Sequence, residues 1–292
     1  GMKMKRYILT ILAAALCLSA CRKEDLNDES IFQDRDDLTE AFDVWLFQNY
    51  VEPYNIQFNH RYVDRESDNQ YNLIPAERSK AIAMAKLIKH LWIGAYDELV
   101  GEEFMKTYCP RMIQLIGSKA YNSQGSVVVG TAEGGMKITL YNVNAINITS
   151  PSISFLNEWF FGTMHHEFAH ILHQTKNYST DFNLISKDYQ GPSWVNLEED
   201  QAHQMGFVTS YASSSTDEDF VEIIAKYVTN PQGWWESLLA SSGEEGKAKM
   251  EKKMEIVRSW LLQSWNIDLD GLRDVVQRRS SELATLNLTD LN

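Results

Sequence analysis

Residues 160–173 read Phe-Phe-Gly-Thr-Met-His-His-Glu-Phe-Ala-His-Ile-Leu-His, and this stretch carries the most informative pattern in the chain. On a helix, its large apolar side chains fall on the side opposite His166 and His170. We therefore expect a largely buried helix that packs one face into the core and turns the other toward a cleft. The apolar residues behind this expectation are Phe160, Phe161, Met164, Phe168, Ile171 and Leu172.

The motif His166-Glu167-Phe168-Ala169-His170 places two histidines four residues apart. Such residues project from one face of a helix, about 6 Å apart along its axis, and can close on one tetrahedral zinc ion. Glu167 lies about 100° around the helix, close to the ion but not bound to it. Its carboxylate is suited to take a proton from water that the metal has acidified. The spacing therefore predicts one hydrolytic Zn2+ site with Glu167 as its general base.

Two further histidines adjoin the motif. His173 shares the face of His166 and His170, and His165 precedes them. A longer motif with a third ligand histidine would need histidine at position 176, which is Lys176, so this class is excluded. We expect His173 to pack or to support a ligand, and His165 to have no role. Because a catalytic zinc keeps three protein ligands and one water, a carboxylate must come from elsewhere in the chain.

Two downstream acidic clusters could supply this carboxylate: residues 198–200 (Glu-Glu-Asp) and residues 217–219 (Asp-Glu-Asp) with Glu222. The second opens an apolar helix and puts Glu218 and Glu222 on one face, which suits a ligand and a carboxylate that orients a histidine. We predict Glu218 as the ligand, with Glu222 as its neighbour or as the alternative ligand.

Other interpretations of these glutamates remain open. Residues 215–218 (Ser-Thr-Asp-Glu) form a capping-box sequence, in which Glu218 would only return a hydrogen bond to the helix start. Glu198 and Glu199 are alternative ligands, although a solvated acidic helix start is the simpler reading of that cluster.

The stretch from Glu218 to Glu222 resembles the second helix of the glutamate-type zincins, which reads Glu-x-Phe-x-Glu and binds zinc through its first glutamate. Tyr211 lies seven residues before Glu218. In the lethal-factor-like members of that group, a tyrosine at this offset assists at the transition state. The resemblance therefore implies that Tyr211 donates to the developing oxyanion. A packing role for Tyr211 in the core is an equal alternative.

The rest of the body predicts a mainly helical α+β domain at residues 38–292, with a small β-sheet or hairpin beside the motif helix. Helical spacing covers Leu38 to Tyr50, Glu77 to Val100 and Glu102 to Ile116. β-Branched runs between Ser126 and Ile148 flank the turn Glu133-Gly134-Gly135, as in a hairpin. We expect Lys137 to Asn147 to form the sheet edge that holds a peptide, or a core strand.

The composition is that of a globular protein, with 292 residues, 44% of them apolar, and a formal net charge of -13. Such a negative surface would repel nucleic acid and anionic lipid, so we expect no nucleic-acid partner. Cys109 is the only cysteine in the body, and we expect a buried thiol there.

The first 20 residues have the features of a secretory signal: a basic start, an apolar run from Ile8 to Leu18, and Gly1 as a cloning remnant. Leu18-Ser19-Ala20-Cys21 resembles the bacterial lipobox, which implies that Cys21 is lipidated and anchors the chain to a membrane. Ordinary cleavage after Ala20 is the alternative. Residues 21–37 are polar and predict a solvated tether.

The whole layout resembles the zinc-binding metallopeptidase lipoproteins associated with bacterial outer-membrane nutrient import. The resemblance implies an outer-membrane lipoprotein on the cell surface or the periplasmic face. It also implies a peptidase that cleaves peptide or protein substrates by Glu-assisted attack of zinc-bound water, with import components as further partners.

Two other functions remain open from sequence. One is a tethered binding protein that presents a captured peptide or glycan to a transporter and whose metal site is structural or vestigial. The other is a zinc hydrolase that acts on a non-peptide amide or a glycan-linked substrate.

Overall fold

The computed structural model describes residues 40–62, 73–121, 127–128, 130–133 and 136–291. The expected signal segment at residues 1–20, the anchor Cys21 and the tether to residue 37 lie outside these residues, as do Gly134 and Gly135 of the expected turn. Residues 41–292 form one compact unit, which is described below. No helix among the described residues combines the length and apolar character needed to cross a bilayer.

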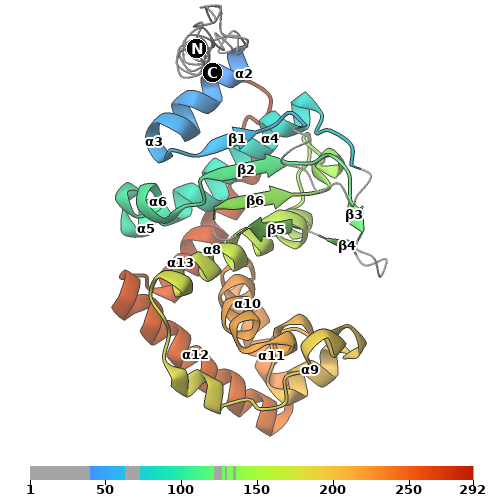
Figure 1. Cartoon of the computed structure of the whole chain (residues 1–292), viewed down its shortest axis with the longest axis vertical. Coiled ribbons are helices and arrows are strands. Elements are labelled where there is room, and N and C mark those ends of the chain that lie inside the picture. The colour runs from blue at the N-terminus through green and yellow to red at the C-terminus, as the bar shows by residue number, and fades with distance from the viewer. Residues whose placement is uncertain (1–39, 63–72, 122–126, 129, 134–135, 292) are drawn as a thin grey trace, which may run out of the picture. The chain divides into compact units, whose positions relative to one another are not determined.

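The unit is a mainly helical α+β fold, as the sequence predicts (Figure 1). Among the described residues, three helices contain a π-helical turn: η1 (Phe47–Val51), η3 (Lys89–Ile93) and η5 (Asn157–Phe161). Short 3-10 turns are η4 (Val143–Ala145), η6 (Thr180–Leu184), η7 (Gly191–Asn196), η8 (Tyr211–Ser214) and η9 (Leu283–Thr285). The α-helices are α2 (Ala41–Leu46), α3 (Glu52–Tyr54), α4 (Arg78–Ile88), α5 (Gly94–Val100), α6 (Glu102–Tyr108), α7 (Ile153–Leu156), α8 (Gly162–Thr175), α9 (Glu199–Met205), α10 (Thr216–Thr229), α11 (Gln232–Ser241), α12 (Gly243–Trp265) and α13 (Leu269–Ser281).

A four-stranded sheet lies beside α8, with the strand order β1-β2-β6-β5. The strands β1 (Gln57–Asn59), β2 (Met112–Leu115) and β6 (Lys137–Leu140) are parallel. The strand β5 (Gly130–Glu133) pairs antiparallel with β6, so the expected hairpin forms. A separate two-stranded ribbon pairs β3 (Ala120–Tyr121) with β4 (Val127–Val128).

The expected helix from Glu102 to Ile116 is wrong in its second half. The helix α6 ends at Tyr108, because Pro110 has no backbone N–H and pushes Cys109 into an extended conformation. Residues 112–115 then form β2, in which Ile113, Gln114 and Leu115 are all fully buried. A parallel strand buried on both faces shows no alternating pattern, and so its sequence resembles a buried helix segment.

Of the two alternatives for Lys137 to Asn147, the structure confirms the core strand and not the sheet edge, and the strand is shorter than expected. Only residues 137–140 form a strand, and this strand, β6, lies between β2 and β5 inside the sheet. The edge next to the motif helix is β5, which packs against α8. Its antiparallel direction follows from the tight connection between Glu133 and Lys137, which are paired in the hairpin.

The helix α8 continues from α7 through the π-helical turn η5, and its apolar face packs as the sequence predicts. Phe168 makes edge-to-face contacts with Trp92, Tyr96 and Phe104, at ring-centroid distances of 5.4, 5.0 and 5.9 Å. These aromatic residues come from η3, α5 and α6, so the N-terminal helices fix the rotation of α8. The opposite face of α8 packs against α10 (Figure 1).

A buried ion pair holds the start of α10 against α12. Lys253 Nζ lies 2.7 Å from Asp219 Oδ2, and both side chains are fully buried. The lysine also donates to the Gly206 carbonyl, and the Tyr189 hydroxyl donates to Asp219. Each charge therefore has a close partner, as a buried charge requires.

Removal of one partner of this ion pair should destabilise the folded protein. We expect Lys253→Met to lower the free energy of unfolding by about 3–5 kcal/mol, because Asp219 would remain buried and unpaired. Chemical denaturation measures the change, with exposed Lys247→Met on the same helix as the control. A loss below about 1 kcal/mol, in the range of surface ion pairs, would contradict this role of the pair.

Candidate metal centre

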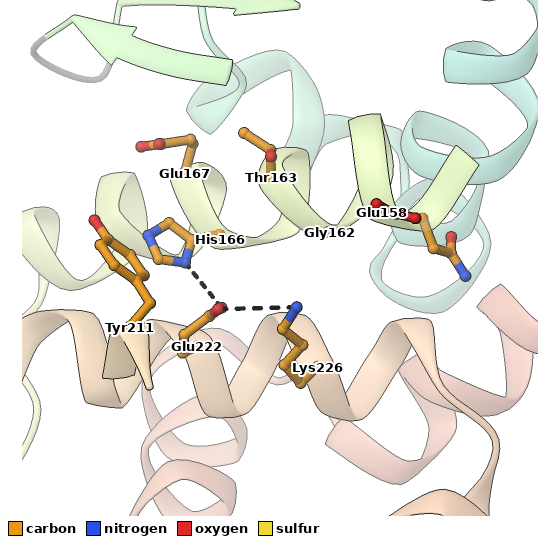
Figure 2. Close-up of a pocket in the computed structure, with 9 residues that line it drawn as sticks. Glu158, Gly162, Thr163, His166, Glu167, Tyr211, Glu222 and Lys226 are labelled. Carbon is orange, nitrogen blue, oxygen red and sulfur yellow. Dashed lines mark hydrogen bonds and ion pairs between the residues drawn. The ribbon is translucent and has the colours of Figure 1, made fainter. Parts of the chain in front are cut away.

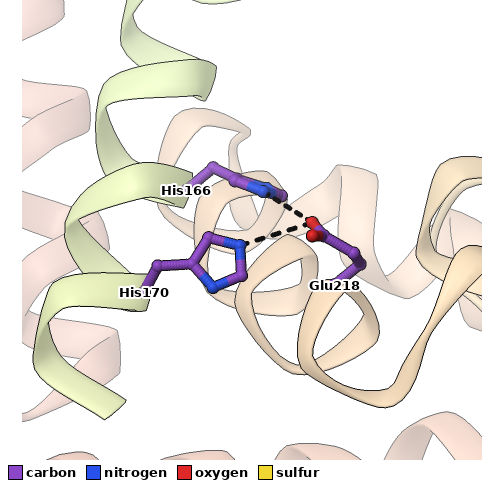
Figure 3. A group of neighbouring side chains, drawn as sticks. All are labelled: His166, His170 and Glu218. Atoms are coloured by element: carbon purple, nitrogen blue, oxygen red, sulfur yellow. Dashed lines mark hydrogen bonds and ion pairs between the residues drawn. The ribbon is translucent and has the colours of Figure 1, made fainter. Parts of the chain in front are cut away.

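The structure brings His166, His170 and Glu218 together (Figure 3). Glu218 Oε2 lies 2.9 Å from His166 Nε2 and 3.4 Å from His170 Nε2. The ligand atoms that the three residues offer all lie within 4.8 Å of one another. Two helices supply them, because α8 carries the histidines on one face and α10 crosses that face with Glu218 in its first turn.

These separations fit a zinc ion. Ligand bonds of 2.0–2.2 Å in tetrahedral geometry place neighbouring donor atoms about 3.3–3.6 Å apart. The 3.4 Å from Glu218 to His170 lies in this range, and the 2.9 Å to His166 is somewhat shorter. Two imidazole nitrogens and one carboxylate also form a donor set of catalytic zinc sites, which leave the fourth position open.

The start of α10 explains why the Glu218 side chain is available. Ser215 caps the helix and accepts a hydrogen bond from the Glu218 backbone N–H. In a complete capping box the glutamate would return to Ser215. Here its carboxylate lies against the two histidines instead, so the cap positions the residue without occupying its side chain.

Glu222 occupies a different place from Glu218. Its Oε2 lies 3.3 Å from Nδ1 of His166, the ring nitrogen that does not face Glu218. Its Oε1 accepts a hydrogen bond of 3.4 Å from the Thr209 hydroxyl. A carboxylate on the second nitrogen fixes the tautomer and orientation of a metal-binding histidine. Glu222 thus contacts the far nitrogen of the His166 ring, while Glu218 lies against the two Nε2 atoms that could hold an ion.

The remaining candidates from the sequence are not members of this group. His173 Nε2 lies 2.9 Å from His170 Nδ1, where it supports the ring of His170. His165 turns to the core and contacts the Tyr96 hydroxyl, and burial lowers its pKa to about 3. Glu199 accepts hydrogen bonds from Ser210. Neither Glu198 nor Glu199 belongs to the metal-binding group found among the described residues.

The carboxylates of the group stabilise positive charge, as a cation-binding site requires. Burial disfavours a charged His166, but its contacts with Glu218 and Glu222 raise the pKa of the ring to about 10. Burial likewise opposes the ionisation of Glu218, yet the two histidines hold its pKa well below the usual range. In the metal-free protein a proton on His166 therefore balances part of the carboxylate charge.

A pocket of about 180 Å3 adjoins the metal centre, and Glu167, Tyr211 and Glu222 line it (Figure 2). Burial raises the pKa of Glu167, which suits a proton acceptor that must later release the proton. Burial and the charge of the nearby Glu218 carboxylate raise the pKa of Tyr211, so its hydroxyl stays protonated. The Tyr211 ring packs against Trp194 and His166, at centroid distances of 5.0 and 5.8 Å.

Sequence reasoning missed Lys226 and Thr163, which also line the pocket. Helical spacing could have identified both residues, because Lys226 follows Glu222 by four residues and Thr163 precedes His166 by three. Both intervals place a residue on the same helix face as the predicted site.

Comparison with known proteins finds a family match. The profile of the family described as "Putative zinc-binding metallo-peptidase" matches residues 36–270. A crystal structure described as that of a putative zinc-binding metallo-peptidase from Bacteroides caccae is 42% identical, with a TM-score of 0.77. The match covers 90% of this chain and 100% of that one. No curated protein matches the chain.

The raised pKa of His166 predicts how zinc binding depends on pH. Below pH about 10 the metal-free ring carries a proton, which zinc must displace. We expect the dissociation constant for zinc to rise about tenfold for each unit of pH decrease between roughly pH 9 and pH 7. Competition titrations against a chelator of known pH dependence measure this slope. A dissociation constant that stays the same across this range would contradict the assignment.

The different places of Glu218 and Glu222 predict different losses of zinc affinity. We expect Glu222→Ala to weaken binding about 10- to 100-fold, because His166 loses its orienting partner. Glu218→Ala should weaken binding further, because it removes a donor atom at the ion. Zinc titrations of both variants, with exposed Glu255→Ala as a control, test this order. The opposite order would assign the donor to Glu222.

Proposed function

The chain belongs to the zinc-binding metallo-peptidase family, and from this premise we propose that it hydrolyses peptide bonds at the centre formed by His166, His170 and Glu218. The observation that supports this most directly is the convergence of the two Nε2 atoms on one carboxylate oxygen beside the pocket that holds Glu167. Bound zinc supplies a Lewis acid that lowers the pKa of water and polarises a carbonyl.

Glu167 has the role of proton carrier in this proposal. Its carboxylate takes a proton from the attacking water and passes it to the leaving amine. The raised pKa from burial supports both transfers, because it brings the group closer to the pH at which the reaction runs. A site that only binds a metal has no need of a base at this position.

Tyr211 has the role of hydrogen-bond donor to the oxyanion. Tyr211 lines the pocket, and its hydroxyl stays protonated because burial and the nearby Glu218 carboxylate raise its pKa. A protonated hydroxyl beside the reacting centre can stabilise charge that develops there. The contacts with Trp194 and His166 hold the ring in place.

The strand β5 is the proposed support for the peptide backbone. It is the edge of the sheet and packs against α8, so an extended substrate could pair with it as an added strand. This pairing would place the peptide across the pocket and would not depend on the side chains of the peptide.

Membrane anchoring at Cys21 and a role in nutrient import are parts of the same proposal. The lipobox-like sequence Leu18-Ser19-Ala20-Cys21 supports an exported lipoprotein of the outer membrane. A partner among import components rests on the family resemblance of the layout. An anchored peptidase would release short peptides close to the membrane at which they are taken up.

Glu167→Gln tests the proposed reaction. With a mixed peptide library and detection by mass spectrometry, we expect the zinc-loaded protein to cleave and the variant to lose about 10²- to 10⁴-fold in rate. The variant should still bind one zinc, because Glu167 is not among the three grouped donors. Glu255→Gln, an exposed change on α12, is the matched control.

Two outcomes would count against the proposal. A parent protein that binds zinc but cleaves no peptide would contradict the peptidase activity and favour a binding protein or a hydrolase of other amides. Undiminished cleavage by Glu167→Gln would contradict the role of Glu167.

A further inference from the structure

One face of α10 carries Glu218, Glu222 and Lys226 at intervals of four residues. The first lies at the metal centre and the second orients His166, whereas Lys226 lies at the pocket beyond them (Figure 2). Eight residues of helix place Lys226 about 12 Å along the axis from Glu218. This distance corresponds to three or four residues of an extended peptide.

The contacts of Lys226 leave its charge available. Its Nζ lies 3.9 Å from Glu222 Oε1, and no other hydrogen bond or ion pair joins it to the part of the chain that the structure describes. Its side chain is 36% exposed, in contrast to the 10% of Glu222. An ammonium group has three donors, so at least two of them can face the pocket.

Three acidic side chains line the pocket with Lys226, and one of them, Glu222, is already engaged. Glu222 accepts from His166 and Thr209 in addition to its contact with the lysine. Glu167 lies farther along the pocket wall and is the proposed proton carrier. Glu158 is exposed at the pocket. The lysine is thus the one cationic side chain among the described residues that line the pocket, apart from a protonated His166.

We propose that Lys226 forms a subsite for a carboxylate of the substrate, within about three residues of the scissile bond. This inference deepens the proposed peptidase function and rests on it. The carboxylate has two sources: an acidic side chain near the scissile bond, or the C-terminal carboxylate of a peptide that ends within about three residues of it. Lys226 therefore determines specificity and takes no part in the chemical step.

Hydroxamate probes test the subsite without any turnover, because a hydroxamate binds to zinc and is not cleaved. We suggest four succinyl hydroxamates, joined to alanine amide, aspartate amide, lysine amide or alanine with a free carboxylate. The aspartate probe represents an acidic side chain and the free-carboxylate probe a peptide C-terminus. Titration calorimetry on the zinc-loaded full chain measures each affinity.

We expect one of the two carboxylate probes to bind about fivefold tighter than alanine amide, as a partly exposed ion pair allows. The probe that gains identifies the source of the carboxylate. Lys226→Met should remove the gain, and Lys226→Glu should transfer it to the lysine probe. Lys247→Met is the matched control and should keep the gain, because Lys247 pairs with Glu251 at the same 3.9 Å and the same spacing on α12.

Equal affinity of the carboxylate and alanine amide probes would overturn the inference. So would tightest binding of the lysine probe to the unmodified protein, which would assign the subsite to the acidic groups. Neither result bears on hydrolysis, so failure of the subsite and failure of the peptidase proposal remain distinguishable.

Discussion

The contact between α8 and α10 is the constraint on which the site depends. Each helix supplies only part of the group: the two histidines come from α8, and Glu218 and Glu222 come from α10. Packed together, they place one carboxylate oxygen 2.9 and 3.4 Å from two imidazole nitrogens and a second carboxylate behind His166. The pairing offsets part of the cost of burying these groups, and zinc would offset more by replacing the proton on His166.

Packing on the far side of each helix holds this contact in place. Behind α8, Phe168 inserts among Trp92, Tyr96 and Phe104, so the face that carries the histidines cannot rotate away from α10. Behind α10, the buried pair of Lys253 and Asp219 ties the residue next to Glu218 to α12. The proposed metal ligands therefore lie on packed helices, while the groups proposed for the reaction and for specificity line the adjoining pocket.

The sequence predicted the parts of this arrangement that depend on spacing within one helix. The interval from His166 to His170 determines a shared face, and the same rule placed Glu218 and Glu222 together. Which glutamate faces the ion depends on how α10 crosses α8, and that is a tertiary property. The prediction of a helix from Glu102 to Ile116 was wrong for a similar reason. Because β2 is buried on both faces, its sequence lacks the alternation of apolar and polar residues by which a strand is recognised. The edge position of β5 likewise follows from sheet order, which no local pattern encodes.

The position of the bound metal is the most direct test of the proposed zinc centre. We suggest crystals of the zinc-loaded protein, with diffraction data collected on both sides of the zinc absorption edge. We predict one anomalous peak, about 2.0–2.2 Å from His166 Nε2, His170 Nε2 and a carboxylate oxygen of Glu218. A peak that is bound by Glu222 in place of Glu218, or that lies away from the two histidines, would contradict it.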